Sequence, residues 1–213
     1  MKTVKTKLII VACVLPLLFM ACGKDNEPNP PTVNNAPITF VKLGNRWDYV
    51  VFENGINYGI STITLVSEEN NRFGVLYNED NNWCFTISTF WYGDGEYWKI
   101  YPHSLYVDTT ASIQLHRNSY VGQKWTYKNI LLGFTELPPI ETKTEEIYEV
   151  LSVSETVTVP AGTFTNCIKI KYQIRYDYGQ IDNWIYWIHK DFGLIKSVNV
   201  ELGLERQLHS KNF

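Results

Sequence analysis

Residues 168–178 read IKIKYQIRYDY, an alternation of apolar or aromatic residues with charged or polar ones. Successive side chains of a β-strand point to opposite faces of the sheet, so this period of two predicts a strand with one face on a core and the other in water. Such half-buried strands are typical of antiparallel sheets, because parallel sheets are usually covered on both faces. This stretch therefore indicates an antiparallel all-β protein.

Similar alternation continues along the chain from Ile38 onward. Its members are Trp47, Tyr49 and Val51; Ile63 and Leu65; Ile147, Glu149, Leu151, Val153, Val157 and Val159; and Val198, Val200 and Leu202. Clusters of Gly, Asn, Asp and Pro separate the runs at intervals of about 8–12 residues, a spacing typical of β-sandwiches and barrels. Residues 130–144, which include Pro138 and Pro139, are predicted to form a long loop. We therefore expect an antiparallel curved sheet that closes into an open barrel or sandwich, with a two-sheet β-sandwich as the alternative.

The first 21 residues have the pattern of a secretory leader. Residues 1–7 are basic, residues 8–20 are apolar, and the small Ala21 precedes Cys22. The apolar run is shorter than the ~20 residues that a transmembrane helix needs, so its removal is favoured over its retention. Residues 1–21 are therefore predicted to be a lipoprotein signal peptide.

The stretch Leu18-Phe19-Met20-Ala21-Cys22 resembles the lipobox of bacterial lipoprotein precursors. The resemblance implies that the Cys22 thiol receives diacylglycerol and that its freed amine is acylated, palmitate being a typical chain. Several acyl chains hold a protein to a bilayer more firmly than one, because each buried methylene contributes about 0.8 kcal/mol. A membrane is therefore the expected partner, through lipid on Cys22. The alternative is an ordinary cysteine after a conventional signal peptide.

Residues 22–37 are rich in Pro and Asn and are predicted to form a flexible tether. Residues 38–213 are then a single β domain. Asp25 and Glu27, close behind Cys22, resemble the acidic export signal of surface lipoproteins in the Bacteroidetes. That resemblance implies a location on the outer membrane with the domain displayed outward.

The composition favours strands and gives no sign of a nucleic-acid partner. The 14 Tyr, 10 Phe and 7 Trp suit a pleated, half-buried surface. Without the three lysines of the leader, the chain has 16 basic against 22 acidic side chains, a formal charge of −6, which argues against nucleic-acid binding. Of the four cysteines, Cys84 and Cys167 fall in the domain, where they either form one disulfide or remain two buried thiols.

Three motifs spread over the domain carry a family resemblance. Residues 44–49 have the pattern Gly-x-x-Trp-x-Tyr, residues 159–164 read Val-Pro-Ala-Gly-Thr-Phe, and residues 184–200 are an aromatic strand, a glycine turn and a last strand. Together they resemble the TapB-like group of bacterial lipoprotein domains of unknown function. The resemblance implies a curved antiparallel sheet or open barrel, akin to periplasmic lipoprotein carriers, and no catalytic residues. The first pattern recurs at residues 122–127, which we interpret as a second strand start; two related halves are the alternative.

The usual catalytic and metal-binding motifs are absent from the sequence. It has no nucleophile elbow, glycine-rich phosphate loop, His-x-x-x-His helix or paired Cys-x-x-Cys ligands. The histidines, His103, His116, His189 and His209, are scattered singly, a spacing that does not suit a metal centre. We therefore expect a protein that is not an enzyme and that has no cofactor and no metal.

An aromatic block is the candidate ligand site. It contains Trp83, Trp91, Tyr92, Tyr97, Trp98 and Tyr101, flanked by Asp80, Asp94 and Glu96. Flat rings beside carboxylates can stack on sugar faces and hydrogen-bond their hydroxyls, which suits a glycan-binding cleft. Core packing is the alternative, since aromatic side chains also fill cores. Calcium at the three acidic residues is disfavoured because their spacing matches no known calcium loop.

These observations predict a non-enzymatic binding or interaction module that lipid holds to the cell envelope. Three other functions are open to the sequence: a surface glycan-binding lipoprotein, an open-barrel carrier of an apolar ligand, and a hydrolase whose site is assembled from distant residues. The sequence does not predict the identity of the ligand.

Overall fold

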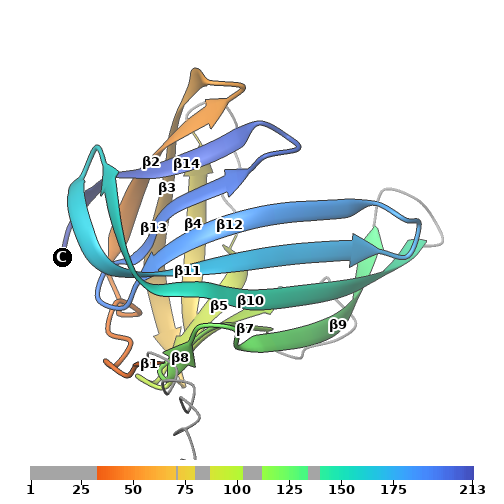
Figure 1. The fold of residues 1–213 in the computed structure, drawn as a ribbon, viewed down its shortest axis with the longest axis horizontal. Helices are drawn as coiled ribbons and strands as arrows, with labels where there is room; N and C mark the ends of the chain where they lie inside the picture. Colours follow the sequence, from red (N-terminus) through yellow and green to blue (C-terminus); the bar gives the residue numbers. More distant parts are fainter. Residues whose placement is uncertain (1–32, 71, 80–86, 103–111, 134–139) are drawn as a thin grey trace, which may run out of the picture. The chain divides into compact units, whose positions relative to one another are not determined.

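A computed structural model describes residues 33–70, 72–79, 87–102, 112–133 and 140–213 (Figure 1). Residues 31–213 form a compact unit of their own. The predicted signal peptide 1–21, Cys22 and most of the predicted tether lie outside the described residues. Within the described ranges, no helix has the length and apolarity needed to span a membrane.

The described residues form fourteen strands. They are β1 (Val33–Asn34), β2 (Arg46–Glu53), β3 (Ile56–Glu69), β4 (Arg72–Glu79), β5 (Ile87–Gly93), β6 (Tyr97–Pro102), β7 (Ser112–His116), β8 (Ser119–Tyr120), β9 (Lys124–Gly133), β10 (Ile140–Val159), β11 (Gly162–Tyr176), β12 (Ile181–His189), β13 (Gly193–Asn199) and β14 (Leu204–Lys211). Twelve of them form one antiparallel sheet in the order β7-β6-β5-β4-β3-β2-β14-β13-β12-β11-β10-β9. The other two, β1 and β8, pair in a small second sheet, so the fold begins inside the range 22–37 that the sequence assigns to the tether.

The large sheet curves until its two edge strands, β7 and β9, approach each other (Figure 1). No ladder joins these edges in the described residues, and side chains connect them instead. The Trp125 indole N–H of β9 donates to the Ile113 carbonyl of β7 over 2.8 Å, and the Trp125 ring lies 4.7 Å from that of His116. The protein is therefore an open barrel with an unsealed seam, as the sequence predicts, and one continuous sheet replaces the two-sheet alternative.

The strand predicted at residues 168–178 is confirmed by β11 as far as Tyr176, whereas Tyr178 lies in the turn that follows and is 63% exposed. Ile168 and Ile170 are fully buried, whereas the intervening lysines face outward. Trp47 and Tyr49 of β2 are likewise buried, as predicted. Because side chains alternate between faces, these residues define the concave face of the sheet as the core side.

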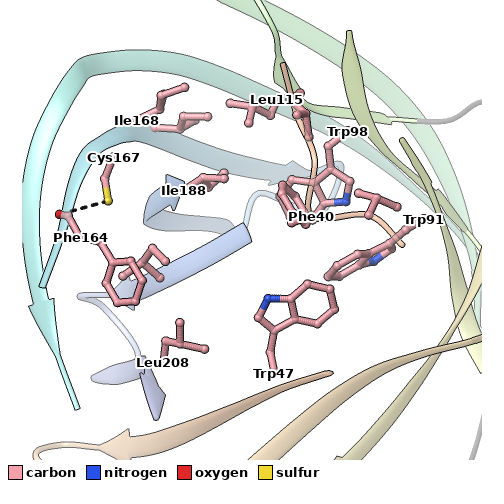
Figure 2. Packing of buried hydrophobic residues seen from close by; sticks show 14 of the residues in the cluster. Phe40, Trp47, Trp91, Trp98, Leu115, Phe164, Cys167, Ile168, Ile188 and Leu208 are labelled. Carbon is pink, nitrogen blue, oxygen red and sulfur yellow. Dashed lines mark hydrogen bonds between the residues drawn. The ribbon is translucent and has the colours of Figure 1, made fainter. Parts of the chain in front are cut away.

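One end of the barrel is packed solid with aromatic rings (Figure 2). Phe40, on the segment between β1 and β2, is fully buried there. Its ring makes edge contacts with Trp47, Trp91 and Trp98 at centroid distances of 6.1, 6.2 and 5.2 Å. Such edge-to-face pairs are a favourable geometry for aromatic side chains. The segment before β2 therefore acts as an internal plug for this end.

Bulges change which residues of β10 face the core. The sequence places Ile147, Glu149, Leu151 and Val153 on one face, but in β10 the pairing with β11 shifts between Val150 and Ser152. Before the shift the buried residues are Tyr148 and Val150, and Leu151 is 39% exposed. After it, Val153, Val157 and Val159 are buried. A bulge inserts an unpaired residue and so exchanges the two faces, which a strict period of two does not anticipate.

Two further expectations from the sequence are wrong. Residues 130–144 are not a long loop, because β9 extends to Gly133 and β10 starts at Ile140, with these two residues paired. In β13 the core-facing residues are Ile195, Ser197 and Asn199, whereas Val200 lies beyond the strand and is 76% exposed. In both places the pairing with neighbouring strands overrides the local pattern.

The recurring glycine pattern marks two strand starts, as interpreted. Gly44 precedes β2 and Gly122 precedes β9, with φ angles of 82° and 86°. Glycine adopts this left-handed conformation without the steric penalty of a Cβ atom. The Pro-Ala-Gly motif is also architectural, since it makes the tight turn between β10 and β11 and places Phe164 in the core.

Candidate functional site

The structure assigns two tryptophans of the predicted aromatic site to the core. Trp91 and Trp98 are 3% and 5% exposed, and their rings pack against each other at 5.0 Å and against Phe40. Both indoles belong to the packed end of the barrel, the core role that the sequence left open for them. Stacking on a sugar requires a free ring face, and these rings are covered.

The other members of the predicted site lie elsewhere or outside the description. Tyr92 and Tyr97 are half-buried, and the Lys99 ammonium lies 5.0 and 4.9 Å from their ring centroids. Trp83 falls outside the described residues, and the side chain of Tyr101 is not among those described. The structure therefore does not bring the six aromatic residues together on one described surface.

The acidic residues beside the block have structural partners. Asp94 accepts hydrogen bonds from the backbone N–H groups of Glu96 and Tyr97, both at 2.9 Å, and so closes its own turn. Glu96 pairs with Arg117. Asp80 lies outside the described residues, and no cluster of three or more His, Cys, Asp or Glu side chains suited to a metal occurs in the part of the chain that the structure describes.

Cys167 is a buried free thiol whose Sγ lies 3.6 Å from the Phe164 carbonyl oxygen. Burial raises the pKa of this thiol to about 12, so it stays protonated and unreactive near neutral pH. Cys84 lies outside the described residues.

A row of stacked rings crosses four neighbouring strands on the concave face. It consists of Trp125 of β9, Tyr148 of β10, Tyr172 of β11 and Tyr186 of β12, which we call the tyrosine row. Successive centroids are 5.2, 4.6 and 5.4 Å apart, with interplanar angles of 3°, 25° and 29°. Sequence reasoning missed this row because its members come from four separate strands.

Strand register explains why these rings meet. Tyr148 is directly opposite both Trp125 and Tyr172, and Tyr186 is opposite Ile170. Residues directly opposite in antiparallel strands share a face, with Cβ atoms about 5 Å apart. Because Ile170 belongs to the core, the whole row lies on the concave side. The rings cover each other's faces, so their edges are what the row offers to the interior.

Glu146 is a carboxylate at the edge of the row. Its Oε2 accepts a hydrogen bond of 2.7 Å from the Tyr148 hydroxyl, and its Oε1 accepts one of 2.7 Å from the Asn129 amide. The Tyr148 hydroxyl itself accepts a hydrogen bond from the Gln114 amide over 2.9 Å. Each polar group of this network has a partner, which a buried polar cluster requires in order not to destabilise the fold.

Side chains of the opposite wall face the same interior. Burial raises the pKa of Tyr186, and the charges of Arg206 on β14 and Glu146 on β10 act on it with opposite signs. Burial also raises the pKa values of Tyr148 and Tyr172 well above the usual range. These hydroxyls are therefore protonated near neutral pH, and that of Tyr148 donates its hydrogen bond to Glu146.

Exposure increases along the concave face, away from the packed end. In β11, Ile168 and Ile170 are buried, whereas Tyr172 and Tyr176 are half-buried. On the outer face of the sheet, at the same end of β9, β10 and β11, lies a pocket of about 520 Å³, within the usual size range of ligand sites. Its lining includes Asn129, Ile130, Thr144 and Tyr176, with Lys128, Lys143 and Arg175 among its charged residues. One end of the barrel interior is thus filled, and the other end carries a pocket on the outer face of the sheet, opposite the face that holds the tyrosine row.

No family model and no curated protein matches the chain. Two solved structures are similar to the chain. One is described as a lipoprotein from Parabacteroides distasonis ATCC 8503; it is 14% identical, covers 83% of this chain and 99% of its own, and has a TM-score of 0.53. The fold is shared. The other is described as an exported protein with a YmcC-like fold from Bacteroides fragilis NCTC 9343; it is 14% identical, covers 84% of this chain and 100% of its own, and has a TM-score of 0.46.

At this low identity the likeness extends to the fold and not to site residues. The resemblance to the TapB-like group continues to rest on its three motifs, since no family model matches. The tyrosine row and the pocket are therefore argued from this chain alone.

Proposed function

We propose that the protein is a lipid-anchored envelope protein that binds an amphipathic ligand, without chemical conversion, in the pocket on the outer face of β9, β10 and β11. The observation that carries this proposal is a pocket of about 520 Å³ whose outward-facing lining combines Lys128 and Lys143 with the apolar Ile130. An amphipathic ligand matches this lining, because its polar head would meet the ammonium groups and its apolar part would meet Ile130 and the methylene stems of the lysines.

The anchor is supported by the leader and by Ala21-Cys22. The solved relative of this fold from Parabacteroides distasonis is itself described as a lipoprotein. Asp25 and Glu27 behind the cysteine support display on the outer membrane. Acyl chains on Cys22 would supply the firm attachment that a single short apolar segment cannot.

Charges at the rim favour an acidic head group. Arg175 pairs with Glu145 at 3.4 Å, and the Asp177 carboxylate accepts a hydrogen bond from the Lys143 backbone N–H. The ammonium groups of Lys128 and Lys143 are then the cations left to meet a ligand at this pocket. A carboxylate or phosphate beside them would gain charge-assisted hydrogen bonds.

Binding without catalysis agrees with the protonation of the row. Tyrosines whose pKa values lie above the usual range act as hydrogen-bond donors near neutral pH, and not as bases or nucleophiles. The glycan alternative has less support, because Trp91 and Trp98 are covered in the core and the tyrosine row offers ring edges instead of faces.

A fluorescent long-chain fatty acid tests the proposed binding. We expect saturable binding to the Cys22→Ser chain purified without detergent, and about tenfold weaker binding after Lys128→Met with Lys143→Met, the loss of roughly 1.4 kcal/mol of charge-assisted contact. The matched control is Lys169→Met with Lys171→Met on the outer face of β11, which should leave affinity unchanged. Absence of saturable binding to the parent chain would contradict the proposal.

The mass of the whole protein, isolated from its native source, tests the anchor separately. We expect that mass to show the loss of residues Met1 to Ala21 and the addition of acyl chains.

A further inference from the structure

Four apolar side chains are exposed together where the chain enters the fold. They are Val33, Tyr120, Val121 and Leu151, with exposed fractions of 48%, 41%, 48% and 39%, and we call them the tether-exit patch. Single exposed apolar residues are common on proteins, whereas contiguous ones mark interaction surfaces. The question is therefore whether these four form one surface and what covers it.

Backbone pairing holds the four residues together. Val33 of β1 is directly opposite Tyr120 of β8, so their side chains share a face, while Ser119 in the alternate position is fully buried. The turn that carries Val121 is tied to β10, because the Gly122 N–H donates to the Val150 carbonyl over 2.8 Å. That bond brings Val121 next to Leu151, the residue after Val150. The patch is therefore continuous over β1, β8 and β10.

A buried ammonium fixes the patch on the barrel. Lys190, 3% exposed, lies in the turn between β12 and β13, and its Nζ donates to the carbonyls of Asn34 at 2.6 Å, Ala36 at 2.9 Å and Arg117. An ammonium has three N–H donors, and here all three are used on the two segments that flank β1 and β8. The orientation of the patch is thus set by the domain and does not depend on the tether.

The length of the tether determines what lies near the patch. Ten residues separate Cys22 from Val33. A chain of that length has an average end-to-end distance of about 17–20 Å and reaches at most about 40 Å, so an anchored Cys22 keeps the patch close to the bilayer. Short flexible linkers of this kind give effective concentrations in the millimolar range, at which even a weak contact is populated.

Two ion pairs flank the patch. Lys124 pairs with Glu149 at 3.2 Å on one side, and Arg117 pairs with Glu96 on the other. Neither pair leaves a net charge to repel or to select lipid head groups. Contact with a bilayer would then depend on apolar insertion and would be insensitive to salt.

We propose that the tether-exit patch rests in the interfacial region of the membrane that holds Cys22, so that the β1–β8 end of the domain faces the lipid. This inference rests on the proposed lipid anchor. The pocket on the outer face of β9, β10 and β11 is not part of the contact, because its residues lie where these strands run away from β8 (Figure 1).

Hydrogen exchange on the acylated full chain tests the inference. The protein is reconstituted in vesicles of phosphatidylcholine and compared with the Cys22→Ser chain in buffer. We expect the amides of residues 118–123 to exchange about tenfold more slowly in vesicles, in low and in high salt, because the bilayer covers them. Amides of the β13–β14 turn, which carries the 76% exposed Val200, should exchange equally in both samples.

Substitutions separate this contact from other causes of protection. Tyr120→Ser with Val121→Ser should abolish the slowing while the acyl chains remain in the mass spectrum, and Val200→Ser should leave it intact. Equal exchange of residues 118–123 in acylated and free protein would overturn the membrane contact and leave the anchor standing. Slowing that appears for acylated protein only at high protein density would also overturn it, by indicating a second copy on the patch. Absence of acyl chains would instead refute the anchor.

Discussion

Two titratable side chains of this protein, Lys190 and His116, lie among partners that are unusual for their residue types. Lys190 is buried against three backbone carbonyls and not against a carboxylate. Burial lowers the pKa of Lys190 to about 8. His116 is half-buried between the rings of Tyr97 and Trp125, and its Nε2 has no hydrogen-bond partner among the described residues. Because burial lowers the pKa of both groups, the free energy of unfolding depends on whether each group is protonated.

His116 makes stability depend on pH in a direction that can be measured. Burial, with a smaller effect of Lys99, lowers the pKa of His116 below the ordinary 6.5. The unfolded chain then binds the proton first on acidification, so this group stabilises the fold above pH 6.5 and that contribution is lost as the pH falls toward the folded pKa. We expect urea unfolding from pH 7 to pH 5 to show a smaller loss of stability in His116→Gln than in the parent. Equal losses would contradict the assignment, and His209→Gln, an exposed histidine, serves as the control.

At the scale of single elements, β10 is the most informative strand. It is 20 residues long, pairs with β9 along its first half and with β11 along nearly all its length, and contains shifts of register that bend it. The bend lets one strand take part both in the seam end and in the tight turn before β11. Bulges increase local twist and curvature, which a single sheet needs in order to close on itself.

Two neighbouring apolar residues of β10 should differ sharply in their effect on stability. Val153→Ser removes buried methyl groups and places a hydroxyl in the core, so we expect a loss of about 2 kcal/mol in the free energy of unfolding. Leu151→Ser, on the exposed side of the bulge, should change it by less than about 0.5 kcal/mol. Chemical denaturation of both variants measures the difference. Equal costs would mean that the bulge does not exchange the faces.

At the scale of the whole domain, the barrel is filled at one end and closed along its side by side chains alone. The edges β7 and β9 meet through Trp125, whose indole donates to the Ile113 carbonyl. An unpaired edge is a site for pairing with other chains, and covering it with a bulky side chain reduces that hazard. The seam is therefore expected to be the weakest part of the wall.

Loosening the seam should be visible without unfolding the domain. Trp125→Phe keeps a ring beside Tyr148 but removes the indole donor, so we expect faster hydrogen exchange in residues 112–116 and a loss of about 1 kcal/mol in stability. Trp187→Phe, on a ring contacted by the Lys169 and Lys196 ammonium groups, is the matched control and should leave exchange in β7 unchanged. If exchange in β7 did not respond to Trp125→Phe, the edges would be held by something other than this contact.

Much of the architecture is present in the sequence because strand alternation is a local property. The period of two in residues 168–178 and at Trp47 and Tyr49 is enough to predict antiparallel strands around a core, and the glycine patterns at Gly44 and Gly122 are enough to predict strand starts. The expected leader and the lipid on Cys22 also come from sequence alone, and they remain predictions because residues 1–32 lie outside the described part of the chain.

The tertiary structure decided what depends on register and on contacts between distant strands. Shifts of register between Val150 and Val157 change which residues of β10 face the core, and no local pattern reveals where they fall. By their sequence, Trp91 and Trp98 could bind a ligand or fill a core. The contacts of their rings with Phe40, in the segment before β2, assign them to the core. The tyrosine row exists because four strands place one ring each at the same level of the sheet, a coincidence of register that no single stretch of sequence contains.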